Sequence, residues 1–95
     1  MSSNPTNRFL LGQIVATPGA IQAIEDAGQT TSVFLSRHVA GDWGEIWDRY
    51  KTLNDEAIDG EAQIMSAYTT SLGVRLWVIT EADRSSTTIL LPEEY

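Results

Sequence analysis

The chain has no cysteine, little positive charge and no long hydrophobic run. Without cysteine there are no disulfides, no thiolate zinc ligands and no cysteine nucleophile, and this absence fits a reducing compartment. No apolar run exceeds about four residues, far fewer than the roughly 18 that span a bilayer. The first residues are polar and lack the basic and apolar regions of a secretory signal. We therefore expect a soluble, cytoplasmic protein.

Positive charge is scarce, with 6 Lys and Arg against 13 Asp and Glu, so the net charge is −7. Non-specific binding to DNA, RNA or an anionic membrane depends on clustered Lys and Arg, and this composition argues against it. An enzyme that handles a few phosphates in a pocket is still allowed.

What is present describes one globular body, because 95 residues with 42% hydrophobic and 20% charged side chains match an average folded domain. We expect residues 1–7 to form a flexible N-terminus and residues 8–95 a single domain. At this length roughly 65% of the unfolded chain's surface is hidden on folding, enough for a core without metal or disulfides.

The first half of the chain predicts one strand followed by two to three helices. The strand covers residues 9–15, with Gly12 as a bulge or a point of close backbone approach. Thr17 and Pro18 are a typical helix start, and the first helix covers residues 18–27.

A second helix begins at Thr30 or Thr31 and ends before Gly41. Asp42, with Glu45 three residues later, then has the spacing of a capping box for a third helix that Gly60 ends. That helix is either continuous or broken near Asn54 and Asp55.

After Gly60 the apolar pattern alternates with a period of two, which predicts three strands over residues 62–68, 74–80 and 86–91. The two links have the length of hairpin loops, so an antiparallel meander is the simplest arrangement. We expect an α+β fold: a two-layer sandwich with an N-terminal strand, helices on one face and this three-stranded meander.

His38 is the single histidine and the natural candidate for a general acid or base near neutral pH. Its position near the end of a short helix equally predicts a capping or surface role. One histidine without carboxylates at suitable spacing makes no metal site, so we expect no metal and no cofactor.

Arg84 lies in a polar hairpin and could bind a phosphate, with Thr87 or Thr88 orienting it. The competing interpretation is ordinary turn chemistry, in which Arg84 pairs with Glu81 or Asp83.

Two glycines bracket Asp42 and Trp43. Trp43 is either a stacking platform beside an Asp42 that orients His38, or it packs over a helix joint that Asp42 caps. The second interpretation leaves only Gly44 unexplained. Trp77, on a predicted strand, is expected in the core, and Trp47 at the margin of the third helix.

Residues 42–61 hold seven of the acids, among them Asp48, Asp55 and Glu56, but only two basic residues, so −5 of the −7 lies there. This segment is either the solvated face of a helix or an acidic surface for a basic protein partner.

Several stretches resemble small bacterial proteins of plasmids and integrative elements, usually labelled only "plasmid-related". The resemblance covers nearly the whole chain after the first seven residues, and its segments are 9–19, 37–38 with 41–44, 66–68 and 77–95. It implies a mobile genetic element and no particular chemistry. More weakly, the order of His38 before a sheet bearing Arg84 and Thr87 or Thr88 resembles the barnase, colicin E5/D and RelE-like nucleases.

Two functions remain open from the sequence. The first is an inhibitor or accessory factor that binds a host-defence or plasmid-maintenance protein through Asp42, Trp43, Asp48, Asp55 and Glu56. The alternative is a metal-independent ribonuclease-like toxin in which His38 moves protons and Arg84 stabilises phosphoryl charge. RNA is a partner only under the alternative. The sequence does not define the oligomeric state.

Overall fold

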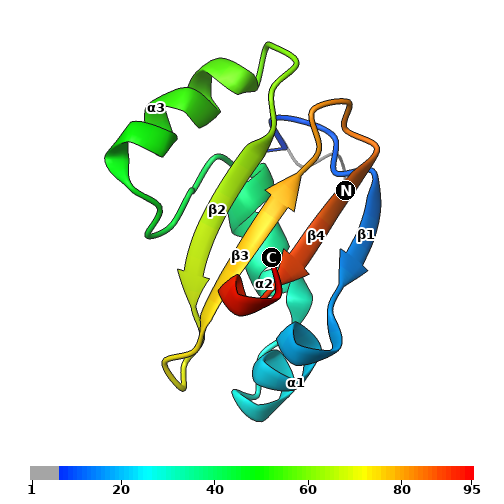
Figure 1. Ribbon diagram of the computed structural model, residues 1–95, viewed down its shortest axis with the longest axis vertical. Helices are drawn as coiled ribbons and strands as arrows, with labels where there is room; N and C mark the ends of the chain where they lie inside the picture. Colours follow the sequence, from blue (N-terminus) through cyan, green and yellow to red (C-terminus); the bar gives the residue numbers. More distant parts are fainter. Residues whose placement is uncertain (1–6) are drawn as a thin grey trace, which may run out of the picture.

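A computed structural model describes residues 7–95, and residues 1–6 of the predicted flexible tail lie outside the described part. Residues 7–95 form three α-helices, four strands and a final 3₁₀ turn (Figure 1). In chain order these are β1 (Gln13–Ala16), α1 (Pro18–Asp26), α2 (Thr31–Val39), α3 (Asp48–Ala57), β2 (Ile64–Thr69), β3 (Arg75–Thr80), β4 (Ser86–Leu90) and η1 (Pro92–Glu94). Within residues 7–95 every helix is too short or too polar to cross a bilayer.

The four strands form one mixed sheet in the order β1-β4-β3-β2. β3 pairs antiparallel with both β2 and β4, whereas β1 runs parallel to β4. The α+β class is therefore confirmed. The more detailed expectation, a two-layer sandwich built on an antiparallel meander, is not confirmed.

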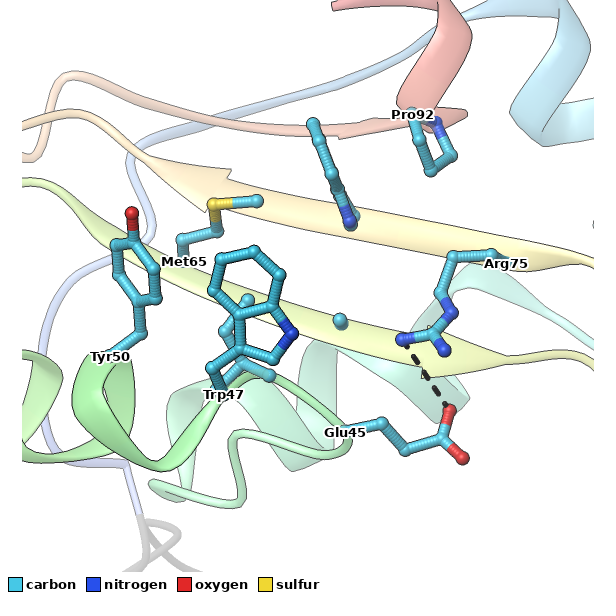
Figure 2. A pocket seen from close by; sticks show the side chains of 9 residues that line it. Glu45, Trp47, Tyr50, Met65, Arg75 and Pro92 are labelled. Atoms are coloured by element: carbon cyan, nitrogen blue, oxygen red, sulfur yellow. Dashed lines mark ion pairs between the residues drawn. The ribbon is translucent and has the colours of Figure 1, made fainter.

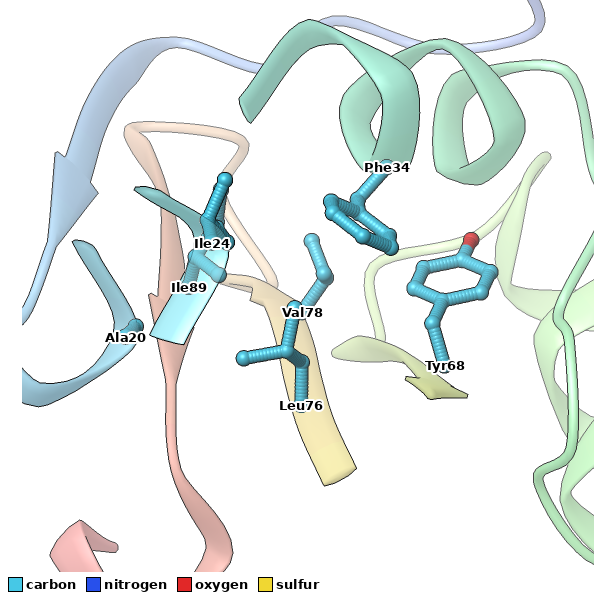
Figure 3. Close-up of a cluster of buried hydrophobic side chains, with 7 residues drawn as sticks. All are labelled: Ala20, Ile24, Phe34, Tyr68, Leu76, Val78 and Ile89. Atoms are coloured by element: carbon cyan, nitrogen blue, oxygen red, sulfur yellow. The ribbon is translucent and has the colours of Figure 1, made fainter. Parts of the chain in front are cut away.

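The main core lies between the sheet and the helices α1 and α2 (Figure 3). Side chains alternate along each strand, so one face of the sheet carries every second residue. This core face meets the buried side chains of both helices, and the cluster consists of Ala20, Ile24, Phe34, Tyr68, Leu76, Val78 and Ile89. A second, smaller cluster joins Trp43 and Ala57 to Ile64.

The start of α1 follows its prediction closely. Thr17 is the N-cap and its hydroxyl accepts from the Ala20 amide at 3.2 Å, while Pro18 occupies the first helical position. Gly12 is indeed a point of close approach, because a Cβ there would collide with the Arg84 and Ser85 carbonyl oxygens.

The third helix begins later than the capping-box pattern predicts. α3 starts at Asp48, with Trp47 as an N-cap that supplies no side-chain hydrogen bond. Asp42 instead binds the Arg37 guanidinium at 2.7 Å, so its carboxylate serves the end of α2 rather than the start of α3. The helix is continuous through Asn54 and Asp55, so the structure has the first of the two alternatives.

Candidate functional site

His38 is completely buried beneath the sheet rather than at the surface. Its Nδ1 lies 2.5 Å from Ser66 Oγ and its Nε2 lies 2.8 Å from Thr80 Oγ1. Thr80 Oγ1 lies 2.7 Å from Thr87 Oγ1, and the Thr87 hydroxyl donates to the Leu11 carbonyl at 2.7 Å. We call this sequence of hydrogen bonds the His38 chain.

The carbonyl at one end determines every donor in the His38 chain. Because the Thr87 hydroxyl donates to Leu11, Thr87 Oγ1 accepts from the Thr80 hydroxyl, and Thr80 Oγ1 accepts from Nε2–H of His38. In the neutral imidazole the Nδ1 atom accepts from the Ser66 hydroxyl. Both nitrogen atoms of His38 are thus engaged.

Burial lowers the pKa of His38 to about 3. The charged form would lose its hydration without gaining a carboxylate, since the side chains at both nitrogens are hydroxyls. Aromatic rings flank the imidazole, with the Phe9 centroid at 5.2 Å and the Trp43 centroid at 5.9 Å. In this arrangement His38 stays neutral at physiological pH and has no open face toward solvent.

The Arg84 guanidinium is occupied by backbone carbonyl groups. It donates to Ala57 at 2.5 Å and to Ala62 at 2.8 Å, with longer bonds to Glu81 and Ala82. The residue itself has φ +62°, in the left-handed region that costs free energy for any residue except glycine. Arg84 therefore fastens the end of α3 to the β3–β4 hairpin through backbone carbonyls. Among the described residues it forms neither of the two ion pairs considered for it, with Glu81 or with Asp83.

Thr87 and Thr88 point to opposite faces of the sheet, because they are neighbours on β4. Thr87 is buried in the His38 chain, whereas Thr88 is half-buried on the other face. The four candidate catalytic residues thus do not line one pocket. The Phe9 ring lies beside both His38 and Arg84, 5.8 Å from the Arg84 guanidinium carbon.

Trp43 belongs to the core and does not offer a stacking surface. It is 5% exposed, and its indole N–H donates to the Asp55 carboxylate at 2.9 Å. Asp42 bonds to Arg37 and to the Gly44 amide, not to His38. The Arg37 guanidinium beside Asp42 lowers the pKa of that carboxyl.

The structure also explains Gly44, which the sequence left open. Its φ is +69°, and a Cβ would collide with the Ala67 carbonyl and the Tyr68 ring. The backbone must come this close because residues 43–45 pair with the outer side of β2: Trp43 O accepts from Ala67 N at 3.2 Å, and Glu45 N donates to Ala67 O at 2.7 Å.

Opposite the His38 chain, an apolar groove of about 400 Å³ lies between the start of α3 and the outer face of the sheet. Figure 2 shows Trp47 and Tyr50 beside Met65 of β2, with the Glu45–Arg75 pair, 3.9 Å apart, near one end. We call this the α3 groove, and its lining residues are Glu45, Ile46, Trp47, Tyr50, Met65, Ala67, Arg75, Trp77 and Pro92.

Three aromatic side chains, Trp47, Tyr50 and Trp77, line the α3 groove. Trp47 is 73% exposed and its ring centroid lies 5.9 Å from that of Tyr50. Trp77, expected in the core, is half-buried on the outer face, where it meets Tyr95 at 5.6 Å. The signal that could have located it is the alternation of β3, since Leu76 and Val78 occupy the core face and Trp77 therefore faces away.

The acids of the 42–61 segment divide into two kinds. Asp42 and Asp55 are tied to Arg37 and Trp43, whereas Asp48 and Glu56 are exposed on α3. Asp48 lies 3.6 Å from Lys51, and Glu56 lines a second hollow of about 320 Å³ that continues from Tyr50 along α3.

Across the described range of the chain, no three His, Asp or Glu side chains gather into a group that could hold a metal ion. No protein-family model, curated protein or solved structure matches this chain. The resemblances to plasmid-related proteins and to nucleases therefore stay predictions.

Proposed function

We propose that this chain is a non-enzymatic binding protein whose contact surface is the α3 groove and the exposed acids of α3. The partner is a basic protein, and the mobile-element resemblance suggests that it belongs to a host-defence or plasmid-maintenance system, with this cytoplasmic chain as inhibitor or accessory factor. The observation that carries the proposal is Trp47, a large aromatic residue left 73% exposed at the mouth of an apolar groove.

Exposed aromatic side chains beside a pocket are the residues that most often dominate protein interfaces. Trp47 and Tyr50 supply rigid apolar area, and Met65 offers an adaptable floor. Leu53, 49% exposed one turn further along α3, extends the apolar surface toward the second hollow. An exposed apolar surface of this kind is typical of a site that binds another protein.

The exposed acidic residues around the groove indicate that the partner is positively charged. Asp48, which lies beside Lys51, and Glu56 flank the apolar surface. Asp59 and Glu61 follow them, and all four are exposed to an incoming molecule. A partner with Lys and Arg around an apolar or aromatic anchor would complement this pattern and would be drawn in faster at low salt. Asp42, Trp43 and Asp55 serve the stability of the fold rather than the contact, because Asp42 is bonded to Arg37 and Trp43 to Asp55.

The test starts with affinity capture from a bacterial lysate, followed by binding measurements on the purified partner. Wild type should retain a basic protein, and the double variant Asp48→Asn/Glu56→Gln should bind it at least tenfold more weakly. The matched control is Glu25→Gln/Asp26→Asn on α1, because it also removes two negative charges, from −7 to −5, but far from the groove. Equal losses in both double variants would mean that only overall charge matters and would contradict the proposal.

The ribonuclease alternative is tested separately by incubating wild type with tRNA and mRNA in EDTA. We expect no cleavage above background, because His38 is buried and neutral and Arg84 binds backbone carbonyls. Cleavage by wild type that a folded His38→Gln variant lacks would restore the enzyme and displace the binding proposal.

A further inference from the structure

The two edges of the sheet are treated very differently. At β2, the outward backbone groups are covered: Ala67 bonds to the 43–45 segment, and the Asn54 amide binds both Met65 O at 2.7 Å and Met65 N at 3.2 Å. At β1, no strand or side chain within the described residues pairs with the outer side. An uncovered edge displays backbone donors and acceptors that only another strand satisfies well.

The outward groups of β1 belong to Ile14 and Ala16. Gln13 N and Thr17 N donate inward to the Ser85 and Ile89 carbonyls, both at 3.0 Å. Because N–H and C=O of one residue point to the same side of a strand, alternate residues face away from β4. Ile14 and Ala16 thus present an unused amide and carbonyl each.

The side chains of this edge are uncharged and, apart from Gln13, apolar. Residues 9–16 contain no charged residue, although natural edge strands are commonly protected by Lys or by inward-pointing charges. Leu10 is 76% exposed, and Ile14 and Val15, on opposite faces of the strand, are 43% and 42% exposed. A strand added here would cover apolar side chains on both faces as well as the backbone.

We propose that β1 is the interface for a second copy of this chain, with the two β1 strands antiparallel across a two-fold axis. In the register that centres on Val15, Ile14 of each copy exchanges backbone hydrogen bonds with Ala16 of the other. The same patch is thereby used twice, as a two-fold interface requires. The result is one continuous sheet through both copies.

Charge placement favours a second copy over a strongly charged partner at this edge. The chain carries −7, which opposes self-association in general. Most of that charge lies at the far side of the sheet, where α3 flanks β2 while β1 forms the opposite edge (Figure 1). Pairing through β1 leaves α3 of each copy at the edge of the sheet away from the interface and leaves both α3 grooves open.

The test is the mass of the full chain in solution by sedimentation, from about 5 to about 500 μM, the range in which small interfaces assemble. Wild type should rise from 10.5 kDa toward about twice that value. Ile14→Pro, which removes the outward N–H without touching a bond to β4, should remain monomeric. The control Ile14→Thr keeps the N–H and the β-branched shape, so it should dimerise within about threefold of wild type.

A wild type that is monomeric throughout overturns the proposal and leaves the edge to a strand of another protein. A folded Ile14→Pro variant that dimerises like wild type also overturns it. If Ile14→Pro fails to fold, amide exchange of wild type decides: Ile14 and Ala16 must exchange at least tenfold more slowly at high concentration. Binding of the basic partner by Ile14→Pro should be unchanged, so this inference and the proposed function can fail separately.

Discussion

The His38 chain and the α3 groove lie on opposite faces of one sheet and reverse what their residue types suggest. Histidine and threonine hydroxyls look like chemistry, yet here they are buried, bonded to one another and closed to solvent. Tryptophan looks like core, yet Trp47 stands in water at the mouth of a groove. Burial, not residue type, separates a structural polar group from a functional one.

The largest effect should follow from cutting the His38 chain. His38→Leu removes the acceptor of Ser66 and the donor to Thr80, leaving buried polar atoms unpaired. We expect the free energy of unfolding to fall by about 3 kcal/mol, measured by urea denaturation. Val33→Ala, an exposed change on the same helix, should alter it by less than about 0.5 kcal/mol. Similar losses of stability for the two variants would show that the His38 chain does not stabilise the fold.

The next effect concerns Arg84, which joins the helix beside the groove to the hairpin of the sheet. Arg84→Lys keeps the charge but cannot reach several carbonyls with one planar group, so we expect a loss of about 2 kcal/mol. Arg49→Lys on the exposed side of α3 is the matched control and should change stability by less than about 0.5 kcal/mol. If Arg84→Lys left the stability unchanged, the structural role of Arg84 would be contradicted and the residue would again be a candidate for ligand binding.

Acid should lower the free energy of unfolding through the protonation of His38. Its pKa is about 3 in the folded chain and about 6.5 when unfolded, so between these values only the unfolded chain takes up the proton. The free energy of unfolding therefore falls as pH falls from about 6.5, by up to about 1.4 kcal/mol per pH unit.

The comparison that isolates this effect is wild type against His38→Gln from pH 7 to pH 4. Carboxyls whose pKa is lowered in the fold, such as Asp42 and Glu94, lose stability in acid in both proteins and cancel. The stability advantage of wild type should shrink as pH falls. An advantage that is constant with pH would mean that the pKa of His38 is the same in the folded and the unfolded chain.

Local patterns predicted local structure well, and failures arose where distant residues intervene. Thr17 and Pro18 start α1 as expected because capping involves only neighbours in sequence. Asp42 has the correct spacing for a cap, but its carboxylate binds the Arg37 guanidinium instead. His38 could not be placed, because its partners Ser66 and Thr80 are 28 and 42 residues away.

The groove was missed for a related reason. The helical stripe predicts Trp47 at a helix margin, and its place on a strand predicts Trp77 in the core. The alternation of β3 separates Trp77 from Leu76 and Val78, but it does not say which of the two faces helices α1 and α2 cover. That depends on how the connections run, which composition and period do not encode.

The smallest effect on stability should come from Trp47, and the sharpest contrast from comparing it with Trp43 four residues earlier. Trp47→Ala changes a side chain that is 73% exposed, so the free energy of unfolding should move by less than about 0.5 kcal/mol. Trp43→Ala removes a buried ring and its bond to Asp55 and should cost about 3 kcal/mol.

Affinity for the basic partner should show the opposite order, with at least a tenfold loss for Trp47→Ala and little change for whatever Trp43→Ala protein remains folded. Calorimetry with the purified partner measures the affinities of the two variants, and urea denaturation measures their stabilities. If both tryptophans proved to matter only for stability, the exposed indole would have no partner and the two faces of the sheet would not differ in function. A split in the expected direction assigns binding to the α3 groove and folding to the buried side, because each variant then changes one property and spares the other.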